Sequence, residues 1–68
     1  MKTMDAKRIG ERLVVLRGNR TQSKVAEDVG ISTSALAMYE KGERIPRDNI
    51  KIRLSEYYSQ PITAIFFE

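Results

Sequence analysis

The chain has no cysteine and no histidine among its 68 residues, and each absence excludes a class of site. Without cysteine there is neither a disulfide framework nor a thiolate metal site, and a reducing bacterial cytoplasm is the expected compartment. Without histidine, zinc sites, imidazole-based catalysis and Ser-His or Cys-His nucleophilic pairs are excluded. We therefore expect no metal and no cofactor.

Long apolar runs are also absent. No stretch reaches the roughly 18 apolar residues of a membrane span, so we expect no membrane partner. The first ten residues carry lysines without an apolar segment behind them, unlike a secretion signal. The length predicts one small domain, residues 1–68, that buries only roughly 60% of its unfolded surface. Its stability then depends on good packing or on a partner.

The net charge of +3 is modest, but cations gather in the second half of the chain. Between positions 41 and 53 they are opposed only by Glu43 and Asp48, and they comprise Lys41, Arg44, Arg47, Lys51 and Arg53. A basic patch beside a groove-binding helix is what phosphate binding requires. Taken alone, the pattern also fits an ordinary solvated helix face.

Apolar periodicity predicts five short helices and therefore an all-α fold, a compact bundle. The first helix covers about residues 5–17, and its apolar face carries Ile9, Leu13 and Leu16. A fourth is expected at about 48–58, with a core stripe of Ile50, Leu54, Tyr57 and Tyr58. Pro61 suits the first turn of a short last helix at about 61–65. Residues 66–68 fit either a helix end or a short strand.

Residues 22–41 are typical of two helices joined by a tight turn. Thr21 and Ser32 are capping residues that begin these helices at about positions 22 and 33. Gly30 and Gly42 end them at about 29 and 41, because glycine adopts a positive φ at little cost. This arrangement predicts a central helix-turn-helix.

Two further features support the motif. The small side chain of Ala26 lets the two helices cross closely, and Gly30 sets the sharp turn between them. One apolar cluster then fixes the crossing angle, and it consists of Val25, Val29, Ile31, Leu36 and Tyr39. With Leu36 and Tyr39 buried, the outward face of the second helix carries Thr33, Ser34, Ala37 and Met38. This face is small and free of acidic charge, which suits close approach to base edges, although an ordinary exposed face remains an alternative.

The chain resembles the Cro and lambda-repressor family of helix-turn-helix regulators, also called XRE-type. The matching residues are Thr21-Gln22, Ala26, Gly30-Ile31-Ser32, Leu36, Tyr39-Glu40, Gly42 and Pro46. The resemblance covers nearly the whole chain. It implies sequence-specific binding of double-stranded DNA by a bacterial transcriptional regulator, a repressor of the small prophage or mobile-element kind.

The resemblance also assigns roles to residues. It gives phosphate contacts to Gln22, Ser32, Lys41 and Arg44, and contacts to base edges or the groove floor to Thr33, Ser34, Ala37 and Met38. Gln22 in addition braces the start of the recognition helix. Arg17 and Glu40 match a structural ion pair, aligned across a loop that is about two residues shorter than usual.

The recognition face departs from the family pattern because it lacks the Gln, Asn or Arg that often read bases there. Each bidentate base contact gives roughly 1–3 kcal/mol of discrimination, which hydroxyl and methyl groups do not match. We therefore expect weak direct readout, more dependence on DNA shape and a need for two half-sites.

Two half-sites require a homodimer on a pseudo-palindromic operator. The predicted dimer surface is the last helix and tail, with Ile62, Ile65, Phe66 and Phe67. Ile62 and Ile65 fit equally well as residues that close the core. An antitoxin or protein-interaction adaptor with the same fold is the alternative function. An enzyme is rejected, because the acidic residues are few and the tyrosines occupy core spacing.

Overall fold

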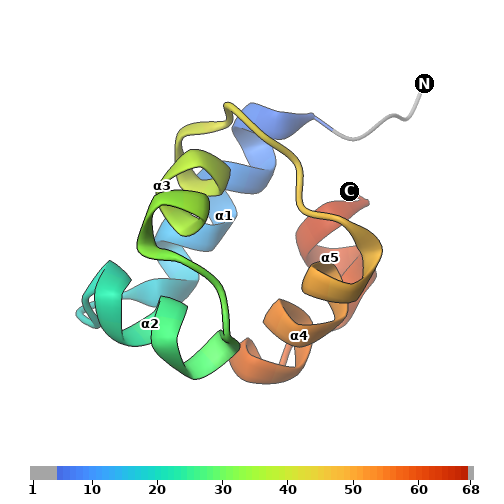
Figure 1. Ribbon diagram of the computed structural model, residues 1–68. Coiled ribbons are helices and arrows are strands. Elements are labelled where there is room, and N and C mark those ends of the chain that lie inside the picture. Colours follow the sequence, from blue (N-terminus) through green and yellow to red (C-terminus); the bar gives the residue numbers. More distant parts are fainter. Residues whose placement is uncertain (1–4, 68) are drawn as a thin grey trace.

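The computed structural model describes residues 5–67, which form five helices (Figure 1). They are α1 (Ala6–Arg17), α2 (Gln22–Val29), α3 (Thr33–Lys41), α4 (Asp48–Tyr58) and α5 (Ile62–Phe66). No strand occurs within these residues, so the expected all-α fold is confirmed. Phe66 ends α5, which favours the helix end over the strand for the tail, while Glu68 lies outside the described residues.

The helix boundaries follow from the capping residues. Asp5 accepts hydrogen bonds from the backbone of Lys7 and Arg8 and so caps α1, as its side chain predicts, with Ala6 as the first residue of the helix. Pro61 likewise precedes α5, so this helix begins at Ile62, one residue after the predicted start. Ser59 ends α4 with a positive φ of 55°, a position that the sequence did not single out.

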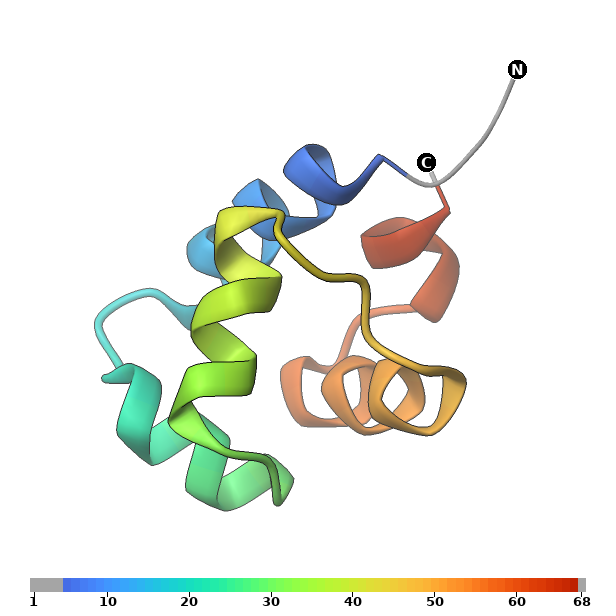
Figure 2. The ribbon, with the colours of Figure 1, turned by 45° about the horizontal axis from the view of Figure 1, so that its top comes forward.

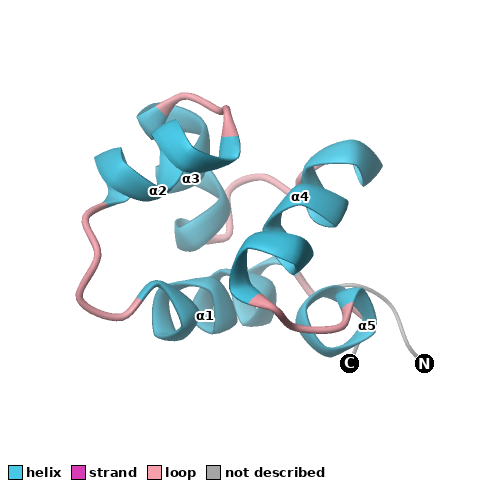
Figure 3. Cartoon of the chain, turned by 90° about the horizontal axis from the view of Figure 1, so that it is seen from below, coloured by secondary structure: helices cyan, strands magenta, loops and turns pink. Residues whose placement is uncertain are grey.

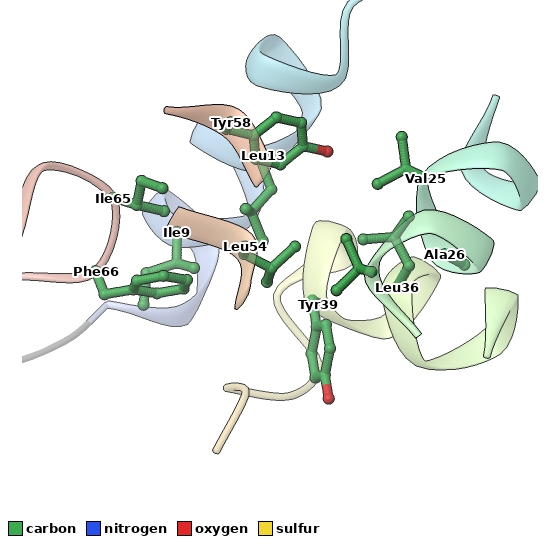
Figure 4. Packing of buried hydrophobic residues seen from close by; sticks show 11 residues of the cluster. Ile9, Leu13, Val25, Ala26, Leu36, Tyr39, Leu54, Tyr58, Ile65 and Phe66 are labelled. Carbon is green, nitrogen blue, oxygen red and sulfur yellow. The ribbon is translucent and has the colours of Figure 1, made fainter. Parts of the chain in front are cut away.

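Figure 3 shows α2 and α3 on one side of the molecule, α1 and α5 on the other, and α4 beside them. Between them lies one core, in which Leu13 and Leu54 are completely buried and occupy the centre of the cluster (Figure 4). The full set of buried apolar residues is Ile9, Leu13, Val25, Ala26, Val29, Leu36, Tyr39, Leu54, Tyr58, Ile65 and Phe66.

Two of the four residues expected on the dimer surface belong to this core. Ile65 is 2% exposed and Phe66 is 1% exposed, so neither can form an outer surface of the folded chain. They fill the space between α5 and the buried faces of α1 and α4 (Figure 4). Phe67 is 49% exposed, and Ile62 is half-buried.

At Gly10 the backbone of α1 comes very close to the end of α3, and the sequence pattern did not single out this glycine. A Cβ at this position would lie 2.4 Å from the carbonyl oxygen of Glu40 and 2.8 Å from that of Tyr39. The absence of a side chain therefore lets the backbone of α1 touch the end of α3. A glycine inside a helix lowers stability, so its presence usually has a packing reason. The position of Gly10 within the first amphipathic helix was therefore the sequence signal for this close contact.

Candidate nucleic-acid interface

The turn between α2 and α3 is held by backbone hydrogen bonds. The Ala26 carbonyl accepts from the amides of both Gly30 and Ile31 at 2.9 Å, and Gly30 has a φ of 87°. On either side, Thr21 Oγ1 accepts from Lys24 N at 3.1 Å, and Ser32 Oγ accepts from Ala35 N at 3.0 Å. The start of each helix is thus fixed by a side chain, and α3 is presented at a defined angle to α2.

The outward face of α3 is open. Thr33 and Ser34 are exposed, whereas Ala37 and Met38 are half-buried. In Figure 2, α3 lies in front along its length, and no described segment of the chain crosses it. A single helix with small side chains fits a major groove about 12 Å wide. The structure therefore leaves the four predicted base-reading residues on one accessible helix.

Two exposed cations follow this face. Lys41 is the last residue of α3, and Arg44 lies in the loop after it. Within residues 5–67, neither makes a salt bridge or a side-chain hydrogen bond, so both are available to phosphates. Beside Arg44 lies a cleft of about 350 Å³ between the end of α3 and the start of α4. Its walls consist of Tyr39, Arg44, Ile45, Arg47, Asn49 and Ile50.

The structure divides the basic cluster of residues 41–53. Arg47 and Asn49 join Arg44 at the cleft. The sequence placed Arg47 only in the general basic patch and gave Asn49 no role in DNA binding. Lys51 instead is 5% exposed, with Nζ 3.4 Å from Asp48 and 5.2 Å from the centre of the Phe67 ring. Arg53 Nη1 lies 3.5 Å from the Val29 carbonyl oxygen. Lys51 therefore serves the fold, whereas Arg53 stays exposed with this one long contact.

The end of α1 is tied to the end of α3 through Glu40, whose side chain is only 3% exposed. Arg17 donates Nε to Oε2 at 2.8 Å and Nη2 to Oε1 at 3.1 Å. These hydrogen bonds raise the pKa of Arg17. Gln22 Nε2 donates to Oε1 at 2.8 Å, so the glutamine that the resemblance assigned to a phosphate also contacts Glu40.

A second group of polar and aromatic side chains holds α4 against α2 and the short loop before it. The Tyr57 hydroxyl donates to Asp28 at 2.8 Å, and this bond, followed by Lys24, lowers the pKa of Asp28. The Arg20 guanidinium lies 5.4 Å and 5.5 Å from the ring centres of Tyr57 and Tyr58. These contacts position α4 and do not reach the outward face of α3.

No group of three acidic side chains within residues 5–67 converges as a metal site. Over the same residues, no helix has the length and apolar character needed to cross a membrane.

The profile of the helix-turn-helix family matches residues 11–65, which is most of the chain. The chain belongs to the helix-turn-helix family. It is of the XRE type and, with that family, a DNA-binding transcription regulator. No curated protein matches the sequence.

Two solved structures show the same fold. The SOS-response transcriptional repressor LexA from Eubacterium rectale superposes with a TM-score of 0.84 at 22% identity, covering 90% of this chain and 67% of that one. The DNA-binding domain of BldD superposes with a TM-score of 0.75 at 21% identity, covering 91% of this chain and 93% of that one. The helix-turn-helix regulator therefore has the lambda-repressor-like arrangement that its sequence resembles.

Proposed function

We propose that this helix-turn-helix protein is a repressor that binds a pseudo-palindromic operator as a homodimer. The observation that carries the proposal is the open face of α3, which is free of acidic side chains from Thr33 to Met38 and is followed by the unpaired cations Lys41 and Arg44. This face enters the major groove, and the cations hold the sugar–phosphate backbone on either side. A repressor role accords with LexA, whose fold this chain shares.

Base edges are contacted by Thr33, Ser34, Ala37 and Met38. The hydroxyls of Thr33 and Ser34 each offer one hydrogen bond, and Ala37 and Met38 offer apolar contact to thymine methyl groups. Because these contacts discriminate weakly, the shape and deformability of the operator contribute much of the specificity.

Phosphates are contacted by Gln22, Ser32, Lys41 and Arg44. The Ser32 oxygen accepts the Ala35 amide, which leaves the hydroxyl proton to be donated to a phosphate. To these we add Arg47 and Asn49, because they line the same cleft as Arg44. The resulting charge gives affinity that falls steeply with salt.

A homodimer is required because one copy reads few bases, whereas two copies about 34 Å apart read both halves of a palindrome. Phe67 and Ile62 remain as the apolar residues of the dimer surface, since Ile65 and Phe66 are buried. Light scattering at micromolar concentration tests this contact. We expect a dimer for the natural chain and a monomer for Phe67→Ser; a monomeric natural chain would contradict the dimer.

The operator is found by selecting bound fragments from random duplex DNA, followed by electrophoretic shifts of the enriched sequence. We expect two related half-sites one helical turn apart, bound with strong salt dependence. Repression is then measured with a reporter gene downstream of that site. If no duplex is enriched or shifted, DNA binding is wrong, and a protein-interaction adaptor becomes the better explanation of the fold.

A further inference from the structure

Glu40, near the end of the recognition helix, is charged and almost completely buried. A buried carboxylate costs much free energy unless several donors hold it. Three nitrogen atoms do so here, two from Arg17 and one from Gln22, at distances between 2.8 and 3.1 Å. The carboxylate is therefore fixed from two helices other than its own.

The contact with Gln22 orients that side chain. An amide group presents two N–H donors at one end and a carbonyl acceptor at the other, whereas an ionised carboxylate only accepts. With Glu40 as its partner, Gln22 must turn its NH₂ end towards the carboxylate, and one N–H is used in that bond. The second N–H stays free at the half-exposed start of α2. Without Glu40, the amide is free to turn its carbonyl outward, which repels a phosphate.

We propose that Glu40 is a positioning residue, which fixes the Gln22 amide so that its second N–H is aimed at one DNA phosphate. This inference rests on the proposed phosphate contact of Gln22. It gives the pair of Arg17 and Glu40 a role in DNA binding beyond joining α1 to α3, since Arg17 holds the carboxylate that in turn holds the glutamine.

A double-mutant cycle tests the proposal with the duplex obtained by selection. Gln22→Met is made in the natural chain and in an Arg17→Met/Glu40→Met background, which removes both charges of the ion pair together and so spares the fold. We expect Gln22→Met to weaken binding about tenfold in the natural chain, as for loss of a hydrogen bond to a charged group, and about twofold or less in the background. Lys41→Ala is the matched control, and it should weaken DNA binding by the same factor in the natural chain and in the Arg17→Met/Glu40→Met background.

Equal costs of Gln22→Met in the two backgrounds would overturn the positioning role while leaving DNA binding intact. Failure of the natural chain to bind any duplex would instead overturn the proposed function, and this inference with it. A measurement on the natural chain needs no substitution. In NMR spectra of the free protein, the Gln22 side-chain amide proton bonded to Glu40 should be displaced from the shift of an unstructured glutamine, and addition of the duplex should shift mainly the other proton. Ordinary unstructured shifts for both protons, or a duplex-induced shift of the bonded proton alone, would contradict the proposal.

Discussion

Arg17 and Glu40 join the last turn of α1 to the last turn of α3, with Nε 2.8 Å from Oε2 and Nη2 3.1 Å from Oε1. The pair is asymmetric, because the Arg17 side chain is 20% exposed and that of Glu40 only 3%. Replacing Arg17 alone therefore leaves the buried charge of Glu40 without its cation. Replacing both residues with methionine leaves an apolar contact and no charge.

The first prediction concerns this asymmetry. Arg17→Met should lower the free energy of unfolding by roughly 3 kcal/mol, because Glu40 then lacks its cation. Arg17→Met/Glu40→Met should recover most of that loss, since buried ion pairs are often replaced by apolar residues at little cost. Urea denaturation at neutral pH measures both values, and a double variant less stable than the single one would contradict the argument.

The second prediction concerns the contact between α1 and α3. Gly10→Ala should lower the free energy of unfolding by about 2 kcal/mol or more, although alanine favours a helix over glycine by about 1 kcal/mol. The added Cβ would lie 2.4 Å from the Glu40 carbonyl, where backbone has to move. Val15→Ala on the same helix is the control, because Val15 is 77% exposed and should change stability little. Thermal melting compares the two, and a Gly10→Ala chain as stable as the natural one would refute the close contact.

The third prediction separates phosphate contacts from base contacts. Lys41→Ala and Arg44→Ala should each weaken binding to all duplexes alike and reduce the slope of affinity against salt by about one. Arg8→Ala should leave the slope unchanged, because Arg8 lines the groove between α1 and α5 and not the cleft beside Arg44. Fluorescence anisotropy titrations at several salt concentrations give these slopes.

The base contacts respond differently. Thr33→Val and Ser34→Ala should change which sequence is enriched from random DNA while leaving the melting temperature unchanged, since both side chains are exposed. Repeating the selection with each variant measures this. If both variants enriched the same sequence as the natural chain, the hydroxyls of Thr33 and Ser34 would not contact bases.

The fourth prediction concerns alkaline pH. Burial, and then the nearby Glu40 carboxylate, raises the pKa of Tyr58 to about 12 from an ordinary value of 10.0. Between these two values the unfolded chain has already released the proton that the folded chain retains, so stability falls as the pH rises. Tyr58→Phe should remove this part of the loss.

The same variant should be at least as stable as the natural chain at neutral pH. The Tyr58 hydroxyl is buried without a hydrogen-bond partner among the described residues, and phenylalanine removes that cost. Urea denaturation of the two chains from pH 7 to 11 tests both statements. If the natural chain and the Tyr58→Phe chain lost the same amount of stability above pH 10, Tyr58 would not titrate in this way.

The sequence by itself determined the five helices, the caps of α2 and α3 and the glycine turn between them. These features depend on neighbours a few residues apart, such as Thr21 bonding to the Lys24 amide or Gly30 adopting a positive φ. The same local pattern gave the helix-turn-helix family and, with it, DNA binding as the function.

Only the tertiary structure decided which side chains are available. Phe66 and Phe67 are adjacent and alike in character, yet one is 1% and the other 49% exposed, because α5 packs one side against the core. In the same way Lys51 turns inward to Asp48 and Phe67, while Arg47 opens onto a cleft. Burial and pairing depend on segments far apart in the chain, and their approach is set by packing that periodicity does not encode.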